Sequence, residues 1–140
     1  MSTTKRFIRN IIVGLFAVLL LLFLPGQVAA RSFYFPKINI DAQITPQGDM
    51  WVTEQRTVAF DGAYKGMFMW IKTPPPTSIS SVTVSENGVP YTFNPGTNIG
   101  PAGTYFIRDE SSRLYIDWSY EAANERRTFT IRYLVHDVIQ

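Results

Sequence analysis

Cysteine is absent from the 140 residues of this sequence, and histidine occurs only once, at position 136. The lack of cysteine excludes disulfide cross-links, thiol catalysis and cysteine-ligated zinc sites. A domain formed by this chain must therefore be stabilised by core packing alone. That is feasible for a length of about 100 residues, at which roughly 60% or more of the surface of the unfolded chain is buried on folding.

Long apolar runs are scarce too, because the only one covers residues 11–24. Three basic residues lie before it, within positions 5–9, and small residues follow it up to Ala30. This order is typical of a signal peptide covering residues 1–30, and we expect cleavage between Ala30 and Arg31. The run is shorter than the roughly 18 residues of a spanning helix. The alternative is an uncleaved N-terminal anchor, since the residues after the run could extend it to membrane length.

Clustered positive charge is missing from the rest of the chain. Residues 31–140 contain ten Lys and Arg against eleven Asp and Glu, which gives a formal charge of −1. A surface that binds phosphates needs grouped basic side chains, and the only adjacent basic pair here is Arg126-Arg127. We therefore expect no nucleic-acid partner, and we assign residues 31–140 to one exported domain.

Past residue 30 the dominant pattern is an alternation of apolar and polar residues, and no helical stripe is present. Gly, Pro, Asn and Asp separate the alternating segments, and Asn87-Gly88 is the strongest hairpin signal among them. Eight strands are predicted, at 38–44, 50–60, 66–72, 79–86, 91–93, 104–108, 113–120 and 127–138. We expect the fifth of them to pair back onto the fourth. This series predicts an all-β, antiparallel, immunoglobulin-like β-sandwich of about seven to eight strands.

The predicted strand at residues 66–72 carries large apolar side chains on both faces. Since neighbours in a strand point to opposite faces, one set fills the sandwich, and the other set, if exposed, marks a contact with a protein or a membrane. The candidate interaction surface comprises Met67, Phe68, Met69 and Trp70. Two covers for it stay open: sequence that follows Gln140, or the aromatic segment 33–35 folding back over it.

Two charged residues inside a predicted strand form a second candidate site. Glu54 and Arg56 share a face of strand 50–60 with Val52 and Val58. We interpret Glu54 and Arg56 as a candidate buried charge that a partner must neutralise, and such a pair favours register more than stability. The alternative is a bulge that lets both side chains reach water.

The residues that could carry catalysis are few. His136 and Asp137 are neighbours in a strand and point to opposite faces, so they form no dyad by themselves. No loop has the alternating Asp/Asn ladder of a calcium site. We therefore expect no enzyme, no cofactor and no metal. A secreted carbohydrate-binding module is the alternative function, with a platform of exposed rings from Tyr64, Trp70 and Trp118.

Three stretches are informative as a set: INIDAQITPQGDMWVTEQRTVAFDG, KGMFMWIKTPPP and FTIRYLVHDVI, in this order between residues 38 and 139. Together they resemble the bacterial predicted membrane proteins known as domain of unknown function 2207, of the YciQ type. That family often has an arginine before an x-Ile-Pro motif, where this sequence has Met69 to Pro74. No role of that arginine is therefore carried over.

The resemblance implies an extracytoplasmic β-sandwich at the N-terminus of a membrane-anchored envelope protein, followed by transmembrane helices. We accordingly expect a non-enzymatic domain at the extracytoplasmic face of the bacterial cell membrane that acts by protein or envelope contact. The membrane would be reached through the N-terminal segment or through a transmembrane region after Gln140, and the domain would be secreted if the chain ends there. Partner identity and oligomeric state do not follow from the sequence.

Overall fold

A computed structural model describes residues 30–96 and 98–139 of the chain. The predicted signal peptide lies outside these residues except for Ala30. The nine strands of the described part are β1 (Ser32–Ile44), β2 (Met50–Asp61), β3 (Ala63–Lys72), β4 (Ser78–Glu86), β5 (Val89–Pro90), β6 (Thr92–Phe93), β7 (Thr104–Asp109), β8 (Arg113–Ala123) and β9 (Arg126–His136). The described residues contain no helix.

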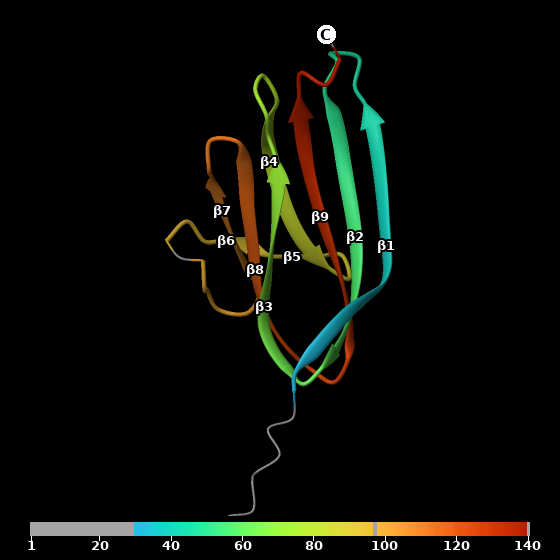
Figure 1. The fold of residues 1–140 in the computed structure, drawn as a ribbon, viewed down its shortest axis with the longest axis vertical. Coiled ribbons are helices and arrows are strands. Elements are labelled where there is room, and N and C mark those ends of the chain that lie inside the picture. Colours follow the sequence, from blue (N-terminus) through green and yellow to red (C-terminus); the bar gives the residue numbers. More distant parts are fainter. Residues whose placement is uncertain (1–29, 97, 140) are drawn as a thin grey trace, which may run out of the picture.

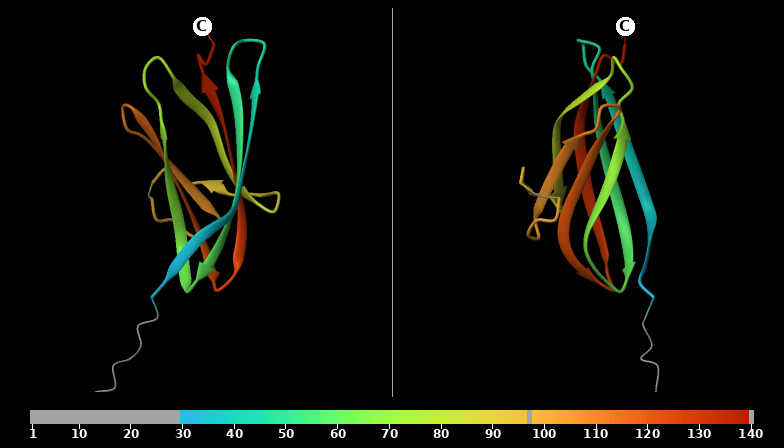
Figure 2. Two further views of the ribbon diagram at one scale, coloured as in Figure 1. Left: turned by 45° about the vertical axis from the view of Figure 1, so that its right-hand side comes forward. Right: turned by 60° about the vertical axis from the view of Figure 1, so that its left-hand side comes forward.

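The strands form two sheets that pack face to face. One sheet has the order β1-β2-β9-β4-β5 and the other the order β3-β8-β7-β6 (Figure 1). The all-β sandwich predicted from the alternating pattern is therefore confirmed, whereas its likeness to an immunoglobulin domain stays a prediction. The two sheets lie close together at the end that holds the β2–β3 and β8–β9 turns, and they separate toward the other end (Figure 2, left).

The β2–β3 connection shows how the chain passes from one sheet to the other. It turns at Gly62, whose φ of +96° lies in the region that only glycine adopts without strain. The Gly62 N–H donates to the Asn124 side chain in the β8–β9 turn at 2.7 Å. The two crossing turns are thus joined to each other, which holds both sheets together at this end.

The segment after the Asn87-Gly88 turn differs from the prediction. Only Val89 and Pro90 pair back onto β4, while Thr92 and Phe93 pair with β7 in the other sheet. The β6–β7 pairing is parallel, so the second sheet is mixed, and the prediction that strand 91–93 pairs back onto the fourth strand was wrong for Thr92 and Phe93. The Tyr91 N–H still donates to the Val84 carbonyl of β4 at 2.8 Å, whereas the next N–H, that of Thr92, donates to the Gly103 carbonyl at 2.8 Å, so the chain leaves the hairpin between these two residues.

Aromatic rings from both sheets meet in the core. The largest side chains with less than 2% exposure are Trp118, Tyr120, Phe129, Ile116, Ile131, Val58 and Val84. The Phe129 ring of β9 lies 4.7 Å from the Tyr120 ring and 5.8 Å from the Trp118 ring of β8, measured between centroids. Burial of such large rings supplies the apolar area that a domain without cross-links needs.

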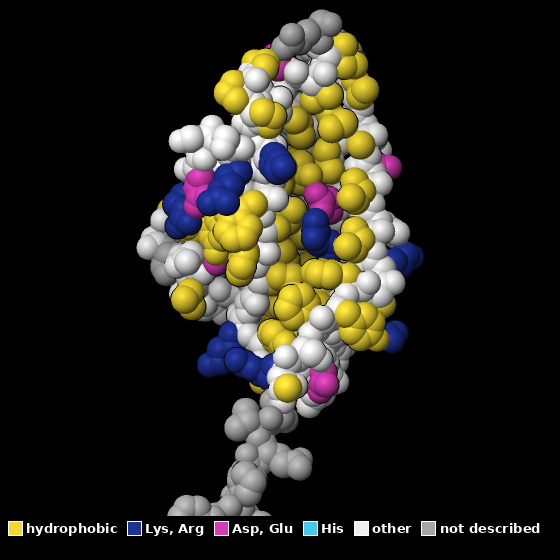
Figure 3. Space-filling view, in the orientation of Figure 1, with side chains coloured by type: hydrophobic (Ala, Val, Ile, Leu, Met, Phe, Trp, Pro, Cys, Tyr) yellow, Lys and Arg dark blue, Asp and Glu magenta, His cyan; other side chains and the backbone are white. Residues whose placement is uncertain are grey.

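Strand β1 is the open edge of the five-stranded sheet, since β2 is its only neighbour. Register pairing places Ile38, Ile40 and Ala42 opposite Arg56, Glu54 and Val52 of β2, on the core-facing side of the sheet. The other sheet does not cover this row, because Ile38 is 45% and Ile40 is 62% exposed. Figure 3 shows the resulting apolar strip along β1 and β2.

Candidate functional site

The outer side of the four-stranded sheet carries four aromatic rings, which we call the aromatic face: Phe68 and Trp70 of β3, Tyr115 of β8 and Phe106 of β7. In the register, Trp70 lies opposite Tyr115, and Phe68 and Phe106 both lie opposite Asp117. Directly opposed residues share a face. The Phe68 ring lies 4.8 Å from the Trp70 ring and 5.8 Å from the Tyr115 ring. The rings therefore form one contiguous surface.

This aromatic face is solvent-exposed at its centre. Phe68 is 54% and Trp70 is 46% exposed. In the space-filling view the apolar side chains gather over β3 and β8, and basic side chains with one acidic group lie directly above them (Figure 3). Exposed apolar rings of this size on one surface are typical of a contact site.

Two arginines border the aromatic face. The guanidinium carbon of Arg108 lies 4.9 Å from the centroid of the Tyr115 ring, and that of Arg113 lies 5.0 Å from the Trp70 ring. Both guanidinium groups donate to Glu110: Arg108 Nε lies 3.0 Å from Oε1 and Arg113 Nε lies 2.6 Å from Oε2. These hydrogen bonds, that from Arg108 most strongly, lower the pKa of Glu110. The border thus carries two positive charges for one negative charge, held in fixed positions over the rings.

Asp117 lies beneath the exposed rings and is itself buried. It accepts a hydrogen bond from the Tyr115 hydroxyl at 3.1 Å. Burial raises the pKa of Asp117, and burial together with the nearby Asp117 charge raises the pKa of Tyr115. The Tyr115 ring lies 5.8 Å from that of Phe68 and 5.6 Å from that of Trp70 between centroids, so Tyr115 and Asp117 together underlie the exposed rings.

Met67 and Met69, the other two residues of the candidate interaction surface, lie on the opposite side of β3. Met69 is buried in the core, and Met67 is half-buried and packs against it. They do not belong to the exposed surface, because successive side chains of a strand alternate between its faces. The predicted surface did not include Phe106, Tyr115 and the two arginines. The alternation within their strands was visible in the sequence, but the pairing of β8 with β3 was not.

The aromatic segment 33–35 does not cover Phe68 and Trp70, contrary to one of the two predicted covers. Phe33 pairs with Phe60 in the other sheet, and its ring contacts those of Phe35 and Tyr64 at 5.9 and 5.7 Å. The segment is held there because it extends β1 along β2. The aromatic face is left without this cover.

Glu54 and Arg56 form an ion pair with each other. Glu54 is 5% exposed and lies on the core-facing side of β2. One of its oxygens accepts hydrogen bonds from Arg56 Nη2 at 2.6 Å and Nε at 2.9 Å, and the other accepts one from the Tyr133 hydroxyl at 2.6 Å. Both carboxylate oxygens are thus used within the domain, which assigns this pair a structural role.

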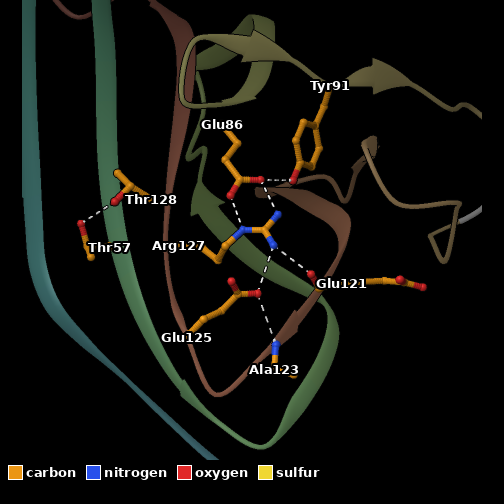
Figure 4. Close-up of polar contacts among 8 residues, drawn as sticks. All are labelled: Thr57, Glu86, Tyr91, Glu121, Ala123, Glu125, Arg127 and Thr128. Carbon is orange, nitrogen blue, oxygen red and sulfur yellow. Dashed lines mark hydrogen bonds and ion pairs between the residues drawn. The ribbon is translucent and has the colours of Figure 1, made fainter.

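A second ion pair joins segments that are distant in the sequence. Glu86 at the end of β4 accepts hydrogen bonds from Arg127 of β9 through both oxygens, and one of these oxygens also accepts from the Tyr91 hydroxyl at 2.9 Å (Figure 4). Arg127 donates further to the Glu121 carbonyl at 2.8 Å and to the Glu125 carboxylate. This cluster was not predicted from the sequence, where Arg126-Arg127 was considered only for nucleic-acid binding, because its members are brought together by strand pairing.

The Glu86–Arg127 pair makes stability dependent on pH. The hydrogen bond from Arg127 lowers the pKa of Glu86 below its ordinary value of 4.5. A carboxylate with a lowered pKa stabilises the folded state above its unfolded pKa, and this contribution is lost as pH falls through its folded pKa. We expect Glu86→Gln to lower the free energy of unfolding by about 1.5 kcal/mol at pH 7. The difference from the unchanged protein should shrink below pH 4.5.

Urea unfolding at pH 7, 5 and 3.5 measures this difference. Glu121→Gln is the matched control, because its side chain is exposed and points away from Arg127 (Figure 4). The control should match the unchanged protein at every pH. If the free energies of unfolding of Glu86→Gln and of the unchanged protein differ by the same amount at pH 7, 5 and 3.5, the Glu86–Arg127 pair is not the source of the pH dependence.

His136 lies between two other polar side chains. Its Nε2 is 2.7 Å from Ser80 Oγ of β4, and its Nδ1 is 3.0 Å from Asp49 Oδ2 in the β1–β2 turn. Asp49 also accepts the backbone N–H of Asp137 at 3.3 Å. His136 thus joins β9, β4 and the β1–β2 turn at one end of the sheet. Asp137 takes part through its backbone.

The sugar platform expected from Tyr64, Trp70 and Trp118 does not exist as a surface. Trp118 is 1% exposed and belongs to the core. Tyr64 is half-buried, and its ring packs on that of Phe60 at 5.1 Å. Of the three rings only Trp70 faces solvent, since Trp70 alone lies on the outer side of the sheet.

Within residues 30–96 and 98–139, no group of three or more His, Asp and Glu side chains is arranged to hold a metal ion. In the same part of the chain no helix has the length and apolarity needed to cross a membrane.

Comparison with known proteins gives one match. Residues 35–140 match the family model described as predicted membrane protein (DUF2207), N-terminal domain. The matched region includes all three stretches from which the resemblance was inferred, and the resemblance is confirmed. No curated protein and no solved structure matches the chain.

Proposed function

Because the chain belongs to the DUF2207 family of predicted membrane proteins, as the N-terminal domain of that family, we propose that it is a non-enzymatic contact domain on the extracytoplasmic side of the cell envelope. Its contact surface is the aromatic face. The observation that carries the proposal is the exposure of Phe68 and Trp70, at 54% and 46%, on the outer side of a sheet next to two arginines.

The chemistry of the aromatic face favours a partner that is both apolar and negatively charged. Exposed rings gain free energy when a partner removes them from water. Arg108 and Arg113 add positive charge and, beyond the N–H groups that donate to Glu110, further donors that carboxylates or phosphates accept. Aromatic residues and arginine are also the side chains most enriched at the centres of protein contacts.

A contact role agrees with how the remaining reactive side chains are used. Glu54 is held by Arg56 and Tyr133, and Glu86 by Arg127. His136 is held between Ser80 and Asp49. These groups all serve contacts between strands of the domain. The Phe68 and Trp70 rings of the aromatic face are exposed to solvent instead.

Site-specific photo-cross-linking of the full chain in its native envelope tests this proposal. A benzophenone amino acid at position 68 should give a defined adduct with a protein or lipid. The same group at position 93 is the matched control, because Phe93 is similarly exposed, at 48%, but lies at the other edge of that sheet. Equal adducts at both positions, or none at 68, would contradict the proposal.

Charge reversal tests the arginine part separately. Arg108→Glu combined with Arg113→Glu should reduce the adduct at position 68 by about tenfold, because like charges then oppose an anionic partner. Both side chains are about half exposed, so the substitutions should leave the fold intact. An unchanged adduct yield would show that the partner is not recognised through its charge.

A further inference from the structure

The open edge of the five-stranded sheet has a sequence that complements itself. Strand β1 exposes its core-facing row, including Ile38 and Ile40, and its opposite face carries Lys37, Asn39 and Asp41. An exposed edge strand with an apolar row is a template for pairing with another strand. The question is which strand can pair with it.

A second copy of β1 fits in one antiparallel register. When two copies run antiparallel about a two-fold axis through Asn39, Lys37 of each copy lies opposite Asp41 of the other. Ile38 of each copy then lies opposite Ile40 of the other, on the face that is 45% and 62% exposed at these residues. Opposite charges and paired aliphatic side chains are both favourable in directly opposed positions.

Alternative symmetric registers lose this match. An axis through Ile40 places Lys37 opposite Gln43 and Asp41 opposite Asn39, and an axis through Ile38 places Lys37 opposite Asn39. Only the axis through Asn39 pairs both charges. Antiparallel pairing about a two-fold axis uses the same patch on both copies and closes the edge without extending into a fibre.

The side chains of β1 are available for this pairing. The Lys37 side chain has no hydrogen-bond or ion-pair partner among the described residues, and Asp41 accepts only from Gln43, through Oδ1 at 3.0 Å. The β1–β2 register is regular from Lys37 to Ile44, with the irregularity confined to residues before Lys37. Pro36, which cannot donate a backbone hydrogen bond, lies at the margin of the paired segment.

We propose that two copies of this chain associate through antiparallel pairing of their β1 strands, centred on Asn39, to form a continuous sheet across a two-fold axis. Pairing gives hydrogen-bond partners to the unpaired backbone N–H and C=O groups of the open edge. It also buries the row that contains Ile38 and Ile40 against the same row of the second copy. The proposal does not rest on the aromatic face, which lies on the other sheet.

Disulfide trapping tests the register directly, because the chain has no cysteine of its own. In the full chain under oxidising conditions, Asn39→Cys should give a cross-linked dimer in high yield, since the two residues face each other on the axis. Gln43→Cys is the matched control, because the register separates its two copies by about 26 Å, or eight residues at 3.3 Å each. No dimer at 39, or equal dimer at 39 and 43, would overturn the proposal.

Charge exchange gives a second readout in the Asn39→Cys background. Lys37→Asp alone and Asp41→Lys alone should each lower the dimer yield at least threefold, because each places like charges opposite one another. The double variant with both changes should restore the yield. All three positions are exposed, so loss of the fold does not account for a loss of dimer. Failure of the double variant to restore the yield would reject this register.

Discussion

Replacing Phe129 by alanine is expected to lower the free energy of unfolding by about 4 kcal/mol, the largest single effect that we foresee. Phe129 is fully buried, and its ring contacts Tyr120 and Trp118 at 4.7 and 5.8 Å. Because these partners belong to the opposite sheet, the cavity left by the substitution lies between the two layers. No disulfide is present to limit the loss, since the chain contains no cysteine.

Equilibrium unfolding of residues 31–140 in urea, followed by tryptophan fluorescence, measures this effect. Phe93→Ala is the matched control, because it removes the same ring from a position that is 48% exposed. The Phe93→Ala substitution should lower the free energy of unfolding by no more than about 1 kcal/mol, since about half of this side chain is already exposed and its ring packs on that of Tyr105. Similar losses for the two variants would show that Phe129 does not join the sheets as described.

Replacing Arg56 by methionine is expected to lower the free energy of unfolding by about 3 kcal/mol. The substitution removes the cation from Glu54, which is 5% exposed and keeps only the hydrogen bond from Tyr133. An unpaired carboxylate in the interior loses its hydration without compensation. Removing one member of a buried ion pair typically costs about 3–5 kcal/mol. We expect a loss at the lower end of this range, because the Arg56 side chain is 22% exposed and water can reach the space that it leaves.

The double variant Glu54→Gln with Arg56→Met separates the charge effect from packing. It removes both charges and keeps the hydrogen bond from Tyr133 to the side chain at position 54. We expect it to recover at least about 1.5 kcal/mol relative to Arg56→Met alone, because replacing both members of a buried pair is often close to neutral. If the double variant is less stable than Arg56→Met, the pair contributes net stability and this interpretation is wrong.

The strand pattern was predictable because it depends on local alternation. Residues 38–44 and 127–138 alternate apolar and polar side chains, and both form long strands, β1 and β9. The strand at 66–72 was also predicted, together with the opposite directions of Phe68 and Met69. The turn at Asn87-Gly88 forms with positive φ at both residues, as its composition indicates.

The pairing partners were not predictable from the same pattern. Tyr91, the first residue of the predicted return strand 91–93, instead links β5 to β6, which lie in different sheets. The candidate site was incomplete for the same reason. Arg108 and Tyr115 complete the aromatic face only because β7 and β8 follow β3 in the sheet order.

The amino-acid sequence by itself determined that this chain forms an all-β sandwich, that the rings and the methionines of β3 point to opposite faces, and that it belongs to a family of predicted membrane proteins. Only the tertiary structure decided which strands lie side by side. It thereby decided that Glu54 is neutralised by Arg56 and Tyr133, that Glu86 meets Arg127, and that the apolar row of β1 is left open. The reason is that alternation specifies the face of each side chain within its own strand, whereas neighbours across strands depend on sheet order and register, which arise from contacts distant in the sequence.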